Sequence, residues 1–483
     1  MRKISAKRLL AKVSNTISER FEMNRNAFGL SVFAFTGLLA LNLGHAELVR
    51  NPTAIGASID LGQIVKGTIY DGEVFSSGRK GDNQQLTRTG VYLTESGTYN
   101  DRLTIQLTVG GLFWFGLPEG TSFQSKRIYF GPGVGQAQGI YSFGSDTKNP
   151  VAKLQFGLFN HKYSESVNLG EYLFRSGTYP AAIVTGGWSY INSAGYMAQG
   201  MSLTVPLLGG KLNNDFTLFM ERDLEPTNDF SPGYVVSYKP VSFFEVGAGV
   251  VWAHAISLNS DRLTPKAEEG NKYSLSSGRP ITHGTPADTC PCGYYTFKGF
   301  KTMARVSLDI GTLLKVDGIH PGDFKLYSEI ALLGVKNQPY YYNKKSERMP
   351  IMGGLDIPTF GLLDKLAFEM EYHKSRFPND IGSVIGSQTA IPVSNGDPYV
   401  YDVNDPRYAT AASKDSLATA LKKDDVKWTL YARRHINSAI SVYAQAANDY
   451  MRNFNSPYAT PAAIPVTSRP SDWYYIIRLE FGI

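Results

Sequence analysis

Few side chains in this chain are spaced for catalysis or for metal binding. Six histidines follow residue 46, and none belongs to a G-x-S-x-G motif, an H-E-x-x-H motif or a group with metal-ligand spacing. A hydrolase could still assemble its site from residues on separate strands. Two of the histidines lie near the ends of predicted strands, but a simpler role for both is to add polarity to one face of those strands. We therefore expect a protein that is not an enzyme and holds neither metal nor cofactor. The two histidines near strand ends are His161 and His373, and the other four are His254, His283, His320 and His435.

The chain has two cysteines, Cys290 and Cys292, in a polar stretch rich in Gly, Pro and Thr. In an oxidising compartment they would form a strained disulfide across one residue, which would clip a loop. The alternatives are free thiols, intermolecular pairing or a metal site. The metal site is the weakest of these, because the only further ligand nearby is His283.

A third group of interest lies in segment 168–180. It combines apolar and aromatic residues at Tyr172–Phe174 and Tyr179 with two charges, Glu171 and Arg175, four residues apart. That spacing suits one helical turn. A loop with such a compact apolar core is expected to fold inward against the protein; the alternative is a lid, or packing onto a neighbouring protomer.

The elements that position these residues are best seen at the C-terminus, where the last strand alternates strictly. A strand with one apolar, partly aromatic face and one charged face suits lipid on one side and water or polar packing on the other. This strand resembles the closing strand of bacterial outer-membrane β-barrels, although it ends in Ile483 rather than an aromatic residue. The resemblance implies recognition by the barrel-assembly machinery. The apolar face is Trp473, Tyr475, Ile477, Leu479, Phe481 and Ile483, and the other is Tyr474, Ile476, Arg478, Glu480 and Gly482.

The same alternation recurs along the chain. We count twelve strands from Val151 onward and expect four more between Val91 and Thr147, which makes about sixteen within a range of about 14 to 18. Residues 47–90 are either a first strand pair, a periplasmic lead-in or a partial plug, and 91–483 are expected to form the barrel. The clearest stretches are 152–158, 201–205, 216–220, 244–252, 302–310, 324–332, 365–373, 426–433 and 440–446.

Short and long connections alternate between these strands. We therefore predict an all-β fold: a closed antiparallel transmembrane β-barrel with short periplasmic turns and long extracellular loops, its apolar face covered by lipid. A soluble β-sandwich or a multidomain β-protein would need a second layer to cover that face. The short connections are 208–211, 239–240, 359–363 and 435–438, and the long ones are 162–195, 257–297, 375–424 and 451–471.

Residues 1–46 have the pattern of a secretory signal peptide. Their apolar core, 28–43, is followed by Gly-His-Ala at 44–46, a pattern of small residues that suits a signal peptidase. We therefore expect cleavage between Ala46 and Glu47. At roughly 16 residues this core is short for a membrane anchor helix, which needs about 20. The preceding basic region is long, and translation from Met23 is an alternative.

The net charge of the whole chain overstates that of the part after the signal. Seven of the 48 basic residues and two of the 42 acidic residues lie in residues 1–46, which leaves 41 bases against 40 acids. The overall charge of +6 comes largely from the leader. The remaining chain lacks the basic excess that binding to nucleic acid requires, so we expect no nucleic-acid partner.

The strand face opposite the apolar one carries charges of both signs. A wall of mixed sign argues against strong ion selectivity, because a ring of one sign sets an electrostatic barrier. We expect neighbours such as Arg305 with Asp309, and Lys325 with Glu329, to satisfy one another. The predicted lumen-lining residues are Lys153, Asp215, Glu221, Glu245, Arg305, Asp309, Lys325, Glu329, Lys365, Glu369, Glu371, Lys427 and Arg433.

The predicted barrel is similar to porins of Gram-negative bacteria. In general porins one loop folds into the barrel, and an acidic and a basic residue narrow the pore. The resemblance is one of position and character, and it implies this role for Glu171 and Arg175. The expected function is passive diffusion of ions and small polar solutes across the outer membrane. The sequence leaves open whether the protein forms a homotrimer. The alternative functions are a structural, adhesin or receptor barrel that acts through loops such as 375–424, and then an outer-membrane hydrolase.

Overall fold

The computed structural model describes the chain in separate stretches. The chain divides into a unit Met1–Leu48 and a unit Val49–Ile483. The described residues belong to the second unit, apart from Leu48. The predicted cleavage site at Ala46 and Glu47 lies outside the described residues, as do Cys290, Cys292, Arg175 and Glu221. The described residues are 48–70, 79–80, 82–115, 129–174, 196–220, 229–253, 255–256, 272–274, 294–296, 299–315, 318–335, 345–374, 424–448, 464–466 and 471–482.

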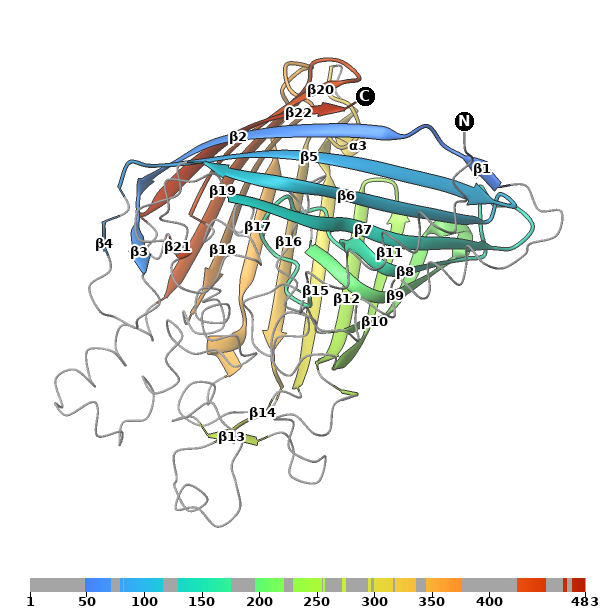
Figure 1. Ribbon diagram of the computed structural model, residues 1–483. Helices are drawn as coiled ribbons and strands as arrows, with labels where there is room; N and C mark the ends of the chain where they lie inside the picture. Colours follow the sequence, from blue (N-terminus) through green and yellow to red (C-terminus); the bar gives the residue numbers. More distant parts are fainter. Residues whose placement is uncertain are drawn as a thin grey trace, which may run out of the picture. The chain divides into compact units, whose positions relative to one another are not determined.

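Sixteen of the described strands pair edge to edge in a closed antiparallel ring (Figure 1). The ring closes because β2 pairs with β5 on one side and with β22 on the other. The predicted barrel and its strand number are confirmed. In ring order the strands are β2 (Ala54–Lys66), β5 (Gln84–Tyr99), β6 (Leu103–Phe115), β7 (Tyr129–Phe143), β8 (Ala152–His161), β9 (Tyr196–Leu207), β10 (Leu212–Met220), β11 (Phe230–Val241), β12 (Phe244–Ala253), β15 (Gly299–Asp309), β16 (Lys325–Leu333), β17 (Ile351–Asp356), β18 (Lys365–His373), β19 (Asp425–His435), β20 (Ile440–Ala447) and β22 (Trp473–Gly482).

A few short elements lie outside the ring. β1 (Leu48–Arg50) adds a three-residue strand to the same sheet. Two small sheets are formed by β13 (Lys272–Ser274) with β14 (Tyr294–Thr296), and by β21 (Ile464–Val466), β3 (Thr68–Tyr70) and β4 (Arg79–Lys80). The described helices are η1 (Leu208–Gly210), α3 (Ile310–Leu314) and η4 (Lys345–Arg348). None of them is long and apolar enough to cross a membrane.

The first strand of the ring lies earlier in the chain than expected. Only β5, β6 and β7 occupy the region between Val91 and Thr147, and the fourth strand of this part is β2, within residues 47–90. Its alternation is visible in the sequence, where the apolar Ile55 and Leu61 stand at odd positions and Asp60 at an even one. In the structure Ile55 and Leu61 are exposed on the outward face, and Asp60 is buried on the inward face.

Short and long connections alternate around the ring, as predicted. η1 joins β9 to β10, and the turn at 435–438 joins β19 to β20. The turn between β11 and β12 lies at 242–243 rather than at 239–240, because β11 continues to Val241 past an irregularity in its register. The connections that follow β8, β12, β18 and β20 are the four longest.

Outward and inward side chains differ in chemistry along strands such as β15 and β18, as the period of two predicts. On β15 the outward residues Phe300 and Val306 are exposed, while the inward Lys301 and Ser307 are buried. On β18 Met370 is 46% exposed and its neighbour Glu369 is fully buried. An exposed apolar surface of this extent is stable in contact with hydrocarbon and unusual in contact with water.

The outward face gives a first prediction. Leu430 is exposed at the centre of β19, and replacing it by Arg should lower the free energy of unfolding in lipid vesicles by about 2–4 kcal/mol, because the charge would enter hydrocarbon. The control is Ile436→Arg in the adjacent short turn, where a charge near the interface should cost about 0–1 kcal/mol. Equal costs at both positions would contradict a lipid-facing wall.

The closing seam gives a second prediction. The buried Asp60 carboxylate accepts hydrogen bonds from Arg88 on β5 and from Arg478 on β22, whose Nε and Nη2 atoms lie 2.5 and 3.0 Å from its oxygens. Asp60→Asn removes the charge between two guanidinium groups and should cost about 3–5 kcal/mol of unfolding free energy. Glu95→Gln, which breaks the exposed ion pair with Arg50, should change it little. Denaturant titrations of both variants in the same vesicles measure the difference.

Candidate functional site

Residues 162–174, hereafter the inward segment, follow β8 directly and lie inside the ring of strands. Their polar contacts reach Glu369 on β18, which is eight strand pairings from β8 in either direction around the ring of sixteen. The segment therefore crosses the interior from one wall to the opposite one.

Glu369 holds the far end of the inward segment. Its carboxylate accepts the backbone N–H groups of Val167, Asn168 and Leu169, the last two at 2.9 Å. The hydroxyl of Tyr327 donates to the same carboxylate at 2.7 Å. A fully buried charge is costly unless such donors surround it, so Glu369 and the segment stabilise each other.

Glu329 on β16 holds the middle of the segment in the same way. It accepts the backbone N–H groups of Glu171 and Tyr172 at 3.0 and 2.9 Å, and the hydroxyl of Tyr163 at 2.7 Å. On the other side of Tyr172, its carbonyl oxygen accepts from the Lys301 ammonium at 3.2 Å. At these points the segment is bound largely through donors and acceptors of its own backbone, and the Tyr163 side chain adds a further contact.

Glu371, two residues beyond Glu369 on the same face of β18, provides a third acceptor. The N–H of Gly170 lies 3.2 Å from its carboxylate, and the Nε2 atom of His373 lies 3.0 Å from it. Gly170 has φ +73°, and a Cβ there would come within 2.7 Å of the Met352 side chain. Glycine is therefore favoured where the segment turns against the wall, because it adopts this positive φ without strain.

Glu171 is turned into its own segment. Its carboxylate accepts from the backbone N–H groups of Tyr163 and Ser164, at 3.2 and 2.6 Å, and the residue is 7% exposed. Burial raises the pKa of the Glu171 carboxyl, against the opposing effects of the Lys162 ammonium and these hydrogen bonds. Its predicted pairing with Arg175 stays a prediction, because Arg175 lies outside the described residues.

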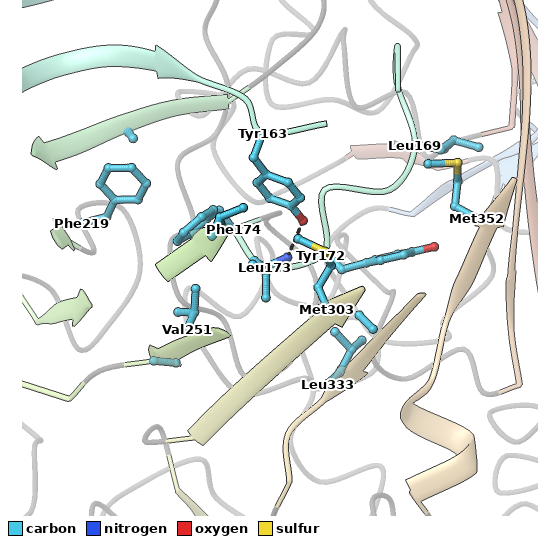
Figure 2. Packing of buried hydrophobic residues seen from close by; sticks show 14 of the residues in the cluster. Tyr163, Leu169, Tyr172, Leu173, Phe174, Phe219, Val251, Met303, Leu333 and Met352 are labelled. Carbon is cyan, nitrogen blue, oxygen red and sulfur yellow. Dashed lines mark hydrogen bonds between the residues drawn. The ribbon is translucent and has the colours of Figure 1, made fainter. Parts of the chain in front are cut away.

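Apolar packing completes the attachment of the inward segment (Figure 2). Leu173 and Phe174 are fully buried against the inner wall. The Phe174 ring lies 5.0 Å from that of Phe219 on β10, and Leu173 belongs to the same buried cluster as Val251 of β12 (Figure 2). Gly249 provides the room, since a Cβ there would lie 2.6 Å from the Leu173 Cδ1 atom.

This apolar inner patch was not expected from the sequence, in which inward positions were assigned to polar residues. Val251 and Ala253 on β12 and Leu333 on β16 all lie inward and are fully buried. The signal that could have revealed them is a run of consecutive apolar residues at the strand end, such as 250–253, because a strand apolar on both faces is covered on both.

The strand registers place the predicted charges of the described strands on the inward face, opposite the exposed apolar residues. Arg305 pairs with Glu245, and Lys325 pairs with Glu165 of the inward segment at 3.0 Å. The expected pairs Arg305 with Asp309 and Lys325 with Glu329 do not form, because residues four apart on a strand are about 13 Å apart. The inward charges are Lys153, Asp215, Glu245, Arg305, Asp309, Lys325, Glu329, Lys365, Glu369, Glu371, Lys427 and Arg433; their role in lining a lumen stays a prediction.

The two strand-end histidines are both part of this interior. His161 lies among aromatic rings, 5.4 Å from Phe174 and 4.9 Å from Phe219 between ring centroids. His373 contacts Glu371 and the ring of Tyr172. Within the described ranges, no three His, Cys, Asp or Glu side chains are grouped to hold a metal ion.

No protein-family model matches the chain, and no curated protein matches it. Among solved structures it is similar to Salmonella typhi OmpF in a complex with daunomycin, at 11% identity and a TM-score of 0.43, over 91% of this chain and 97% of that one. It is also similar to a mutant of the Rh. blastica porin, at 7% identity and a TM-score of 0.39, over 89% of this chain and 100% of that one. A third similar structure is a triple mutant of the Rhodopseudomonas blastica porin, at 7% identity and a TM-score of 0.38, over 89% of this chain and 100% of that one. The assignment of the fold rests on the strand registers.

The carboxylate anchors give a third prediction. Glu369→Gln keeps the size of the side chain but removes a charged acceptor, and each charge-assisted hydrogen bond is worth about 1.5–3 kcal/mol. Amide exchange across residues 167–169 should therefore accelerate about ten- to a hundredfold, measured by hydrogen–deuterium exchange of the folded barrel. Glu245→Gln on β12, which pairs with Arg305, is the matched inward control and should leave this exchange unchanged.

Proposed function

We propose that the protein is a porin-like channel of the outer membrane through which ions and small polar solutes diffuse passively. The observation that carries the proposal is the inward segment, which leaves β8 and is anchored on β18 across a closed ring of sixteen strands. About eight strands enclose only their own side chains, whereas sixteen leave room for an aqueous path. A single segment across that space narrows it.

The outer face supports a place in the membrane. Closure pairs the strand edges, so the backbone offers the lipid no unsatisfied hydrogen-bonding groups. The alternation of exposed apolar and buried polar residues continues to the terminal strand β22, where Ile477 and Phe481 are exposed and Arg478 is buried. We therefore expect outer-membrane lipids to surround the barrel, and the assembly machinery to recognise β22.

The mechanism is diffusion past a fixed constriction. The inward segment holds its position through backbone N–H groups bound to Glu329, Glu369 and Glu371, so its shape depends little on solute. Passage of this kind requires no nucleophile, proton transfer or cofactor. Glu171 sets the shape of the segment from within, and Arg175 is proposed to extend into the opening that remains.

Single-channel recording gives the fourth prediction and tests the proposal. The purified full chain in a planar bilayer should show stable, nanosiemens-scale steps. Glu369→Gln should raise the mean conductance or its noise, because the inward segment is held less firmly. Glu95→Gln, on the outward face of β5, should behave like the wild type. A folded barrel that conducts nothing would overturn the proposal and favour a structural or adhesive role, since only a channel conducts.

A further inference from the structure

We infer that the channel prefers small anions, and that Lys153 and Arg433 determine this preference. The inference deepens the proposed function and rests on it. Its basis is the state of the charges on the described part of the inner wall: there the acidic side chains are engaged by other groups of the protein, whereas these two cations form no ion pair.

Several of the inward acids on the described strands are neutralised by basic neighbours on the wall. Asp60 lies between Arg88 and Arg478, and Arg478 also lies 3.5 Å from Glu480. Such carboxylates add little to the potential that a passing ion experiences, because a partner of opposite sign lies within hydrogen-bond range. The other pairs of this kind are Glu245 with Arg305 and Asp356 with Lys365.

Another group of acids is used to hold the chain. Glu329, Glu369 and Glu371 are fully buried under the inward segment and accept its N–H groups. Asp309 accepts the N–H groups of Thr312 and Gly322, both at 2.9 Å, at the turn after β15. These carboxylates are directed into the protein rather than toward a solute.

Lys153 and Arg433 differ from all of these. Neither has an ion pair or a hydrogen bond from its side chain to any other residue in the described part of the chain. Lys153 is exposed. The nearest inward acid in its row is Asp215, which is separated from it by Thr204 and is bound to the Thr204 hydroxyl at 2.5 Å.

The position of the two cations suits a selectivity role. Lys153 is the second residue of β8, and Arg433 is two residues from the end of β19, so both lie at the short-turn end of the barrel. β8 and β19 are seven pairings apart by the shorter way around the ring of sixteen. The cations therefore lie on nearly opposite sides of one mouth, where low-dielectric walls concentrate their field on an entering ion.

The test is the reversal potential of the full chain in a planar bilayer under a KCl gradient. For the wild type we expect a reversal potential whose sign indicates a preference for chloride. In the double variant Lys153→Gln with Arg433→Gln, the reversal potential should shift in the direction of potassium preference. Lys153→Arg should retain the wild-type value. Arg434→Gln is the matched control: it neighbours Arg433 but faces outward, with its Nη1 atom 2.6 Å from the Gly361 carbonyl, and it should also retain that value.

The outcomes separate the two proposals. A channel that conducts but prefers potassium, or whose preference the double variant leaves unchanged, would overturn the inference while the channel function stands. Absence of conductance in the wild type would overturn the function itself. Salt offers a measurement without any variant: at 1 M KCl the screening length falls to about 3 Å, so the chloride preference should decline, and a preference that does not change with salt would contradict a role for these two charges.

Discussion

Closure of the sheet between β2 and β22 is the constraint on which the rest of this structure depends. An open sheet of this length would present two rows of unpaired N–H and C=O groups, which hydrocarbon cannot satisfy. Pairing the first strand with the last removes both edges. At that seam Asp60 is bound on both sides by arginines from the neighbouring strands, so the register of closure is also specified by charge.

The same requirement, that buried polar groups be paired, organises the interior. The inward segment has little regular structure of its own, and its backbone N–H groups would be unsatisfied inside the barrel. Glu329, Glu369 and Glu371 supply the missing acceptors, while the segment supplies the donors that these buried carboxylates need. Each partner stabilises the other, and these contacts hold the segment in its position across the interior.

The charge of the interior consequently differs from a sum over its ionisable residues. Counted in the sequence, the inner wall is mixed in sign and close to balanced. Counted by contact over the described strands, carboxylates such as Glu369 and Asp60 are engaged by the protein, whereas Lys153 and Arg433 face the interior without an ion pair. The apolar inner patch at Val251 and Leu333 has a similar origin, because it is covered by Leu173 and Phe174 of the segment rather than by water.

The sequence by itself determined the parity of the wall, the number of strands after Val151 and the alternation of short and long connections. Each is a local property: in a strand, neighbouring side chains point to opposite faces, so polarity along the chain identifies the inward residues. The tertiary structure alone decided which inward residues meet. Arg305 joins Glu245 rather than Asp309, and Glu369 binds a segment some two hundred positions away in the chain. Those partners follow from closure of the sheet and from the path of the inward segment across the barrel. Neither produces a repeating pattern in the sequence from which it could be predicted.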